Sequence, residues 1–200
     1  MVLVLVALLG GGLLGLGVRV ARPPRRSRRL DRPPPLRGVL LPVLAVAAEA
    51  WGAWLSARTA APYVLGVLAG FVLLAYFVVV NRRLPGIGLV ATGLTLNTMV
   101  VVLDGAMPVS TAAAARAGLR PDQAVPPGDV AHLAADATTR LRWLGDTIAF
   151  PLPGHAAVLS PGDLLVAAGV GLAAYTLVRT WRPGRRTATR PSASTAGRRG

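Results

Sequence analysis

The stretch that decides the fold is Asn97–Ser110, NTMVVVLDGAMPVS, in which a long apolar run meets an acid, a glycine and a proline. The run over residues 84–103 is long enough to cross the ~30 Å hydrocarbon layer as a helix, which takes about 20 residues. Asp104 and Gly105 interrupt this run, and Pro108 cannot continue a helix because it has no backbone N–H. The pattern predicts a membrane helix that ends at Asp104 and emerges into a loop.

The chain as a whole is too apolar to fold as a water-soluble domain. Hydrophobic residues make up 53% of its 200 residues, charged residues make up 15%, and the mean hydropathy is +0.55. Several apolar runs reach the length of a membrane-spanning helix. We therefore expect an all-α, polytopic membrane protein with about five transmembrane helices. The expected spans are residues 2–18, 38–57, 62–80, 84–103 and 162–179.

The connection over residues 104–161 is expected to fold as a cap on the outer ends of the helices. A connection of this length without secondary structure is uncommon in compact proteins. Ser110 can N-cap a short helix over Thr111–Ala117, and Gly118 suits the left-handed position that follows it. The segment Ser160–Asp163, SPGD, has the pattern of a helix start in which serine and aspartate cap each other.

The distribution of arginine predicts the topology. All 22 basic residues are arginines, and the net charge is +14. Residues 19–37 contain eight arginines and the tail from Arg179 contains seven, whereas residues 104–161 contain four arginines against five aspartates. Because the arginine-rich side of a membrane protein is cytoplasmic, we expect the N-terminus and the 104–161 connection outside and the C-terminus in the cytoplasm.

The two ends of the chain differ in composition. No charge precedes the apolar run at residues 2–18 and arginines follow it, which is the pattern of a retained span rather than a cleaved signal peptide. Residues 181–200 are rich in arginine, serine, threonine and glycine and are expected to be disordered. Residues 1–180 are expected to form a single integral membrane domain.

The arginine clusters also limit the partners. Because they lie beside apolar spans, they indicate contact with the lipid bilayer rather than with nucleic acid. Arg19–Arg37 and the C-terminal arginines could bind anionic lipids, or could serve as a topology signal alone. The absence of cysteine excludes disulfides, cysteine-bound zinc and thiol catalysis. We expect no metal and no cofactor, since the histidines and acids show no tight ligand spacing.

Several short segments of the chain resemble a known family. They are Asn97, Gly105–Ser110 (G-x-M-P-V-S), Ala117–Leu119, Leu144–Ile148 (L-G-D-x-I) and Ser160–Asp163 (S-P-G-D). Their order and spacing are similar to those of an uncharacterised family of small bacterial integral membrane proteins, a domain of unknown function. The resemblance covers most of residues 1–180 and implies a protein of the bacterial plasma membrane. It implies no activity.

Two polar residues lie inside expected spans. Glu49 is an acid well inside an apolar run, which by default indicates function, although it could instead lie at the interface near Trp51. Glu49 and Asn97 both fall about 17 Å along their helices at about 1.5 Å per residue, so they could meet at one level. Asn97 shares a helix face with Gly86 and Gly93, where its amide could bond to a neighbouring helix or line a polar pathway.

Three aspartates are expected near the outer face. Asp104 ends the fourth span, Asp163 begins the fifth, and Asp146 lies among apolar residues that suit the membrane interface. We expect them to gather around the ends of the two spans as a structural latch or as a cation or acid–base site, which His132 and His155 could join. Because like charges repel, an arginine should balance them. The candidate arginines are Arg140, Arg142 and Arg116.

Three classes of function are compatible with these residues. The leading one is an accessory or interaction protein of the plasma membrane with an unidentified membrane protein partner, since it requires no chemistry that the sequence lacks. The second is a small-solute or proton carrier that uses Glu49 and Asn97, although internal repeats typical of carriers are missing. The third is a lipid-acting enzyme at the outer face that uses Asp104, Asp146 and Asp163; an enzyme is less favoured, because no nucleophile motif is present.

The topology can be tested with reporter fusions. Fusions after Arg83 and in the C-terminal tail should show cytoplasmic reporter activity, and a fusion at Gly118 should show external activity, because of the arginine asymmetry. A pair of reporters that are active on opposite sides of the membrane provides the control. Cytoplasmic activity at Gly118 would contradict the predicted topology.

Overall fold

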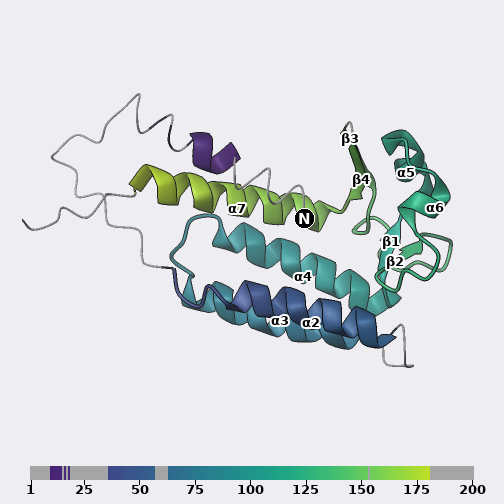
Figure 1. Ribbon diagram of the computed structural model, residues 1–200, viewed down its shortest axis with the longest axis horizontal. Coiled ribbons are helices and arrows are strands. Elements are labelled where there is room, and N and C mark those ends of the chain that lie inside the picture. The colour runs from purple at the N-terminus through teal and green to yellow at the C-terminus, as the bar shows by residue number, and fades with distance from the viewer. Residues whose placement is uncertain are drawn as a thin grey trace, which may run out of the picture.

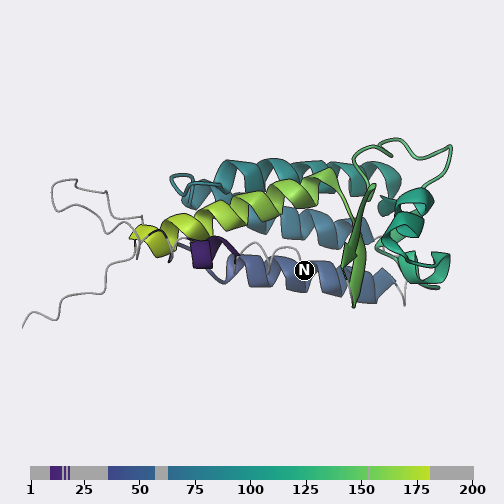
Figure 2. The same ribbon diagram turned by 90° about the horizontal axis from the view of Figure 1, so that it is seen from above.

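Long helices lie side by side, and short elements gather at one end of them (Figure 1). The computed structural model describes residues 10–14, 16, 18, 36–56, 63–152 and 154–180. The long helices are α2 (Leu41–Ser56), α3 (Tyr63–Val80), α4 (Ile87–Asp104) and α7 (Pro161–Thr180). Residues 105–160, which we call the cap, connect α4 to α7, and the view from above shows the cap confined to the same end of the helices (Figure 2).

Three of these helices are long and apolar enough to cross a membrane. They comprise Tyr63–Val80, Ile87–Asp104 and Pro161–Arg179, close to the third, fourth and fifth expected spans. The second expected span is an apolar helix of 16 residues, Leu41–Ser56, and is shorter than the others. Five spans are thus not confirmed. The first expected span lies mostly outside the described residues, as do most of the 19–37 arginine segment and the 181–200 tail.

Helix α4 ends where the sequence predicted. Gly105 follows Asp104 in a left-handed conformation with φ of 86°, and its N–H donates to the Val101 carbonyl oxygen. Glycine adopts this conformation without steric cost and commonly ends helices. The chain then turns into the cap.

Glycines allow the helices to approach closely in two pairs. A methyl group on Gly66 of α3 would meet the Ala48 carbonyl oxygen and Gly52 of α2. Between α4 and α7, a methyl group on Gly93 would meet the Gly162 carbonyl oxygen. Small residues at helix contacts let backbones pack closely.

The cap contains strands that the all-α prediction did not include. Strand β1 (Met107–Val109) pairs in parallel with β2 (His132–Ala134), and β3 (Ile148–Leu152) forms an antiparallel pair with β4 (His155–Leu159). The fold is therefore mostly helical with small two-stranded sheets. Strands of three to five residues are too short to show a periodic pattern in the sequence.

Two short helices complete the cap. Helix α5 (Thr111–Ala117) begins as predicted, with the Ser110 hydroxyl accepting the Ala113 N–H, and it ends at Gly118 with φ of 82°. Helix α6 (Pro121–Ala124) follows directly. The local capping signals in the sequence were therefore correct for α5.

Gly93→Ala should destabilise the protein. The added methyl group would meet backbone atoms of Gly162 and Val166, which cannot move aside as a flexible side chain can. Overpacking of this kind costs about 1–3 kcal/mol, and the thermal midpoint in mild detergent should fall.

Gly88→Ala is the matched control on the same helix. A methyl group there meets nothing within 4 Å, and alanine favours a helix over glycine by about 1 kcal/mol. Its midpoint should stay the same or rise. Equal losses in both variants would contradict the proposed contact between α4 and α7.

Candidate functional site

A hydrogen-bonded group joins the start of α7 to the middle of α4. The Asp163 N–H donates to the Ser160 hydroxyl at 2.9 Å, and the Ser160 N–H donates to the Asp163 carboxylate at 3.0 Å, which is the reciprocal cap that the SPGD segment predicted. The Asn97 amide then donates to the other Asp163 oxygen at 2.8 Å and accepts the Ser160 hydroxyl proton at 3.0 Å. Asn97 therefore fixes the position of α7 along α4.

A polar cavity of about 260 Å³ lies beside this group, under the cap. Side chains from α2, α3, α4, α7 and β2 converge on it. Its polar lining residues are Glu49, Tyr63, Asn97, Thr98, His132, Asp146 and Asp163. Its apolar lining residues are Val67, Leu94, Val101, Met107 and Ala131. Convergent polar groups in an otherwise apolar pocket are the usual form of a small-molecule site.

Asp146 is held at the cavity by its backbone and not by its carboxyl group. Its N–H donates to the Pro108 carbonyl oxygen at 2.8 Å and its own carbonyl oxygen accepts the Ser110 N–H at 2.9 Å. The preceding Gly145 has no room for a side chain, because a methyl group would meet that same Pro108 oxygen at 2.5 Å. Only 7% of Asp146 is exposed. The L-G-D segment thus places a buried acid against the cavity.

Burial changes the acidity of Asp146. Removal of the carboxyl group from water raises its pKa to about 7, and the neighbouring Asp163 charge acts in the same direction, while His132 acts against them. An Asp146 side chain with this pKa is protonated in part of the molecules at neutral pH. Perturbed acids in cavities are candidates for a functional role.

His132 is oriented by Asp129. The His132 Nδ1 lies 2.9 Å from the Asp129 carboxylate, whose other oxygen accepts the Ala131 N–H at 2.7 Å. Burial alone would raise the pKa of Asp129, but the hydrogen bonds from Ala131 and His132 outweigh it and lower this pKa. The contact leaves the rest of the imidazole ring available to the cavity.

The structure brings four of the five candidate residues together. Glu49, Asn97, Asp146 and Asp163 all line the cavity. Asp104 does not line it, and the expectation of one shared site for the three aspartates is not met at this residue. The Asp104 carboxylate instead accepts the backbone N–H groups of Arg140 at 2.9 Å and Leu141 at 3.3 Å, because α4 ends directly below that turn of the cap.

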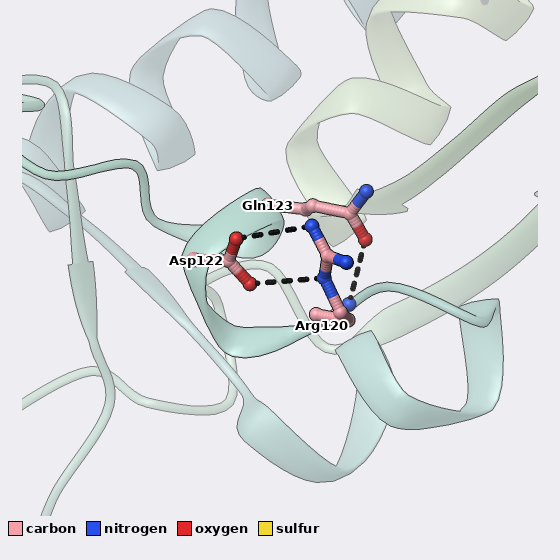
Figure 3. Close-up of polar contacts among 3 residues, drawn as sticks. All are labelled: Arg120, Asp122 and Gln123. Carbon is pink, nitrogen blue, oxygen red and sulfur yellow. Dashed lines mark hydrogen bonds and ion pairs between the residues drawn. The ribbon is translucent and has the colours of Figure 1, made fainter.

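The expectation that arginine balances the acids is also wrong within the described residues. The Arg140 guanidinium donates to the Leu103 carbonyl oxygen, and Arg142 lies 5.0 Å from the centre of the Trp143 ring. In this part of the chain the only arginine–carboxylate ion pair is Arg120–Asp122, 3.2 Å apart on the exposed surface of the cap (Figure 3). At Asp146, burial favours the neutral form of the carboxyl group. A neutral carboxyl group needs no arginine to balance its charge.

Sequence reasoning missed Tyr63 and Thr98 in the cavity wall and Asp129, which orients His132. It included Asp104 and His155, which do not line the cavity. Tyr63 begins α3, Thr98 follows Asn97, and Asp129 precedes His132 by three residues. Only the Asp129–His132 spacing could have indicated a local pair. His155 is exposed on β4 and does not line the cavity.

The chemistry of the cavity favours binding over metal coordination. Within the described residues, no group of three or more histidine or acidic side chains is arranged to hold a metal ion. The lining offers carboxyl and amide oxygens, an imidazole and a phenol, all of which can form hydrogen bonds to a polar molecule.

The pKa of Asp146 predicts a pH-dependent stability. The pKa is raised from 3.8 to about 7 in the folded protein, so the folded state keeps its proton longer than the unfolded chain does. The free energy of unfolding is therefore greatest below pH 3.8 and falls as the pH rises from 3.8 to about 7. The total loss is roughly 4 kcal/mol, at about 1.4 kcal/mol per pKa unit. Asp146→Asn should have a thermal midpoint similar to that of the unmodified protein below pH 3.8, and an increasingly higher midpoint as the pH rises from there to about 7.

Asp122→Asn, at the exposed ion pair, serves as the control and should keep the original pH dependence. An Asp146→Asn protein whose midpoint follows the unmodified protein at every pH would show that Asp146 does not titrate in this range.

Comparison with known proteins identifies a family and no closer relative. No curated protein and no solved structure matches the chain. One family model matches residues 35–175, which contain the long helices α2, α3 and α4, the cap, the cavity residues and most of α7. The chain therefore belongs to the family of unknown function DUF5317.

Proposed function

We propose that the chain is a multi-pass protein of the bacterial plasma membrane that binds a small polar solute in the cavity under its cap. The proposal includes the topology that the arginines predict, with the N-terminus outside, the cap outside and the C-terminus in the cytoplasm. The observation that carries it is the convergence of polar side chains from four helices and the cap on one cavity. Polar side chains are costly within the apolar layer and tend to mark solute pathways.

The cavity volume favours a small solute. Its volume of about 260 Å³ is slightly below the ~300–1,000 Å³ of pockets for drug-sized ligands, and it could not enclose a whole lipid. The lipid-acting enzyme also loses support because Asp104 bonds to the cap and does not line the cavity.

Both remaining classes of function can use this cavity. A carrier would bind its solute through Glu49 and Asn97, which line the same space although they lie on different helices. An accessory protein would use the bound solute to control its contact with another membrane protein. A partner contact alone would not require a polar cavity, and we therefore place solute binding first.

Access to the cavity can be tested with a cysteine, since the natural chain contains none. Thr98→Cys places a thiol in the cavity wall. We expect a membrane-impermeant methanethiosulfonate reagent, added to intact cells, to modify this thiol, because the proposed cavity opens to the outer side. The modified fraction is measured by counting the thiols that remain after denaturation.

Val72→Cys is the matched control. Val72 is 65% exposed on α3, a candidate membrane span, so lipid should surround its thiol and block modification. A second pair, Thr98→Trp and Val72→Trp, tests binding itself. Mass spectrometry of the denatured protein should detect a small molecule released from the unmodified chain and from Val72→Trp, and not from Thr98→Trp. An unreactive Thr98→Cys, or the same released molecules in all three proteins, would contradict the proposal.

A further inference from the structure

Two acids of the cavity, Asp146 and Glu49, differ from the other acids in the described part of the chain. The carboxyl groups of the other five have defined partners. Asp104 accepts backbone N–H groups, Asp122 pairs with Arg120, Asp129 with His132, Asp136 with Thr138 and Thr139, and Asp163 with Asn97 and Ser160. The Asp146 and Glu49 carboxyl groups form no hydrogen bond or ion pair with any described residue, and both line the cavity.

Asp146 carries the argument, because it is an almost fully buried acid whose carboxyl group has no partner among the described residues. The residue is 7% exposed and contributes to the cavity wall, and its carboxyl oxygens are not fully sealed from solvent. The carboxyl group can therefore bind a molecule that enters the cavity. An asparagine or a serine in the same position would keep the backbone contacts without a titrating group.

The cavity is lined by acidic side chains, whereas the chain as a whole is strongly basic. The chain has a net charge of +14, yet none of the described residues that line the cavity is an arginine. Three carboxyl groups face the space, from Glu49 on α2, Asp146 in the cap and Asp163 on α7. The Tyr63 ring lines the same space, and aromatic faces attract organic cations.

We infer that the solute is a small organic cation, whose ammonium group compensates Asp146 and Glu49 beside the Tyr63 ring. The inference rests on the proposed function and names the solute class for the same cavity. A bare metal ion fits less well, because the described histidines and acids form no group of three that could hold one. An alkylammonium needs only hydrogen-bond acceptors, a negative charge and an aromatic face.

Binding of the cation should release a proton. The groups that face Asp146 are Asp163 from α7, Glu49 from α2, Tyr63 from α3 and His132 from β2. Burial raises the pKa of Asp146 to about 7, so the proton is present in part of the empty molecules at neutral pH. A cation in the cavity favours the ionised carboxylate, and the proton leaves to solvent. Affinity should therefore increase as the pH rises through this value.

The test uses the Thr98→Cys protein and two reagents of opposite charge. These are trimethylammonium-ethyl methanethiosulfonate, a cation, and sulfonatoethyl methanethiosulfonate, an anion. The ratio of their rate constants, divided by the same ratio for free 2-mercaptoethanol, cancels the ionisation of the thiol. We expect the normalised ratio to favour the cation at least tenfold at pH 8. At pH 6 this ratio should be several-fold lower than at pH 8.

Single-residue variants test which acid causes the preference for the cationic reagent. Asp146→Asn and Glu49→Gln, each combined with Thr98→Cys, should lower the ratio several-fold, and Asp146→Asn should also reduce its pH dependence. Asp122→Asn is the control, because its carboxylate pairs with Arg120 on the surface of the cap and does not line the cavity. If one acid variant does not reach the membrane, the other still tests the charge preference.

The outcomes separate this inference from the proposed function. If neither reagent modifies Thr98→Cys, the accessible cavity itself is wrong. If both modify it at equal normalised rates, the cavity is accessible and the cation assignment is overturned. Methylammonium should slow the modification at concentrations where sodium does not. Equal protection by sodium would overturn the assignment of an organic cation.

Discussion

The Asn97 amide is the constraint on which the site depends. A polar amide within an apolar helix must find hydrogen-bond partners, because a buried and unpaired polar group costs on the order of 1–3 kcal/mol. The start of α7 satisfies both ends of this amide, with Asp163 as the acceptor and the Ser160 hydroxyl as the donor. Any shift of α7 along α4 would break both bonds. The pair of helices therefore has one defined register.

The glycines make this register possible. A methyl group on Gly162 would meet the Asn97 side chain, and one on Gly93 would meet the Gly162 carbonyl oxygen. The two helices can thus approach until the amide reaches the cap of α7. The same approach places Asp163 in the cavity wall, so one carboxylate caps a helix, binds Asn97 and contributes to the site. Its structural and functional roles do not exclude each other.

The features predictable from sequence are those encoded by neighbouring residues. The Ser110 cap, the end of α4 at Gly105 and the reciprocal cap of Ser160 and Asp163 follow from short patterns whose geometry is local. The cavity could not be predicted in this way. Its wall combines residues separated by more than a hundred positions, from Glu49 to Asp163, and depends on how deep each helix sits against the next.

The two expectations about the aspartates had different causes. An arginine was expected near Asp146 because every acid was treated as a permanent charge, whereas Asp104 was grouped with Asp146 because it ends α4. The structure satisfies Asp104 with two backbone N–H groups and leaves Asp146 buried without an arginine. A buried carboxyl group can lose its charge by binding a proton, and then needs no counterion. This distinction depends on burial, which no short sequence pattern encodes.

The Asp146 carboxyl group does not add to the stability of the cap. The backbone of this residue alone provides the contacts to β1, so an uncharged side chain at this position would support the cap equally well. A carboxyl group there lowers the stability above neutral pH, because ionisation must occur in a buried space. Proteins commonly depart from the most stable choice at functional sites. A buried acid that is neutral in part of the molecules at neutral pH fits that pattern.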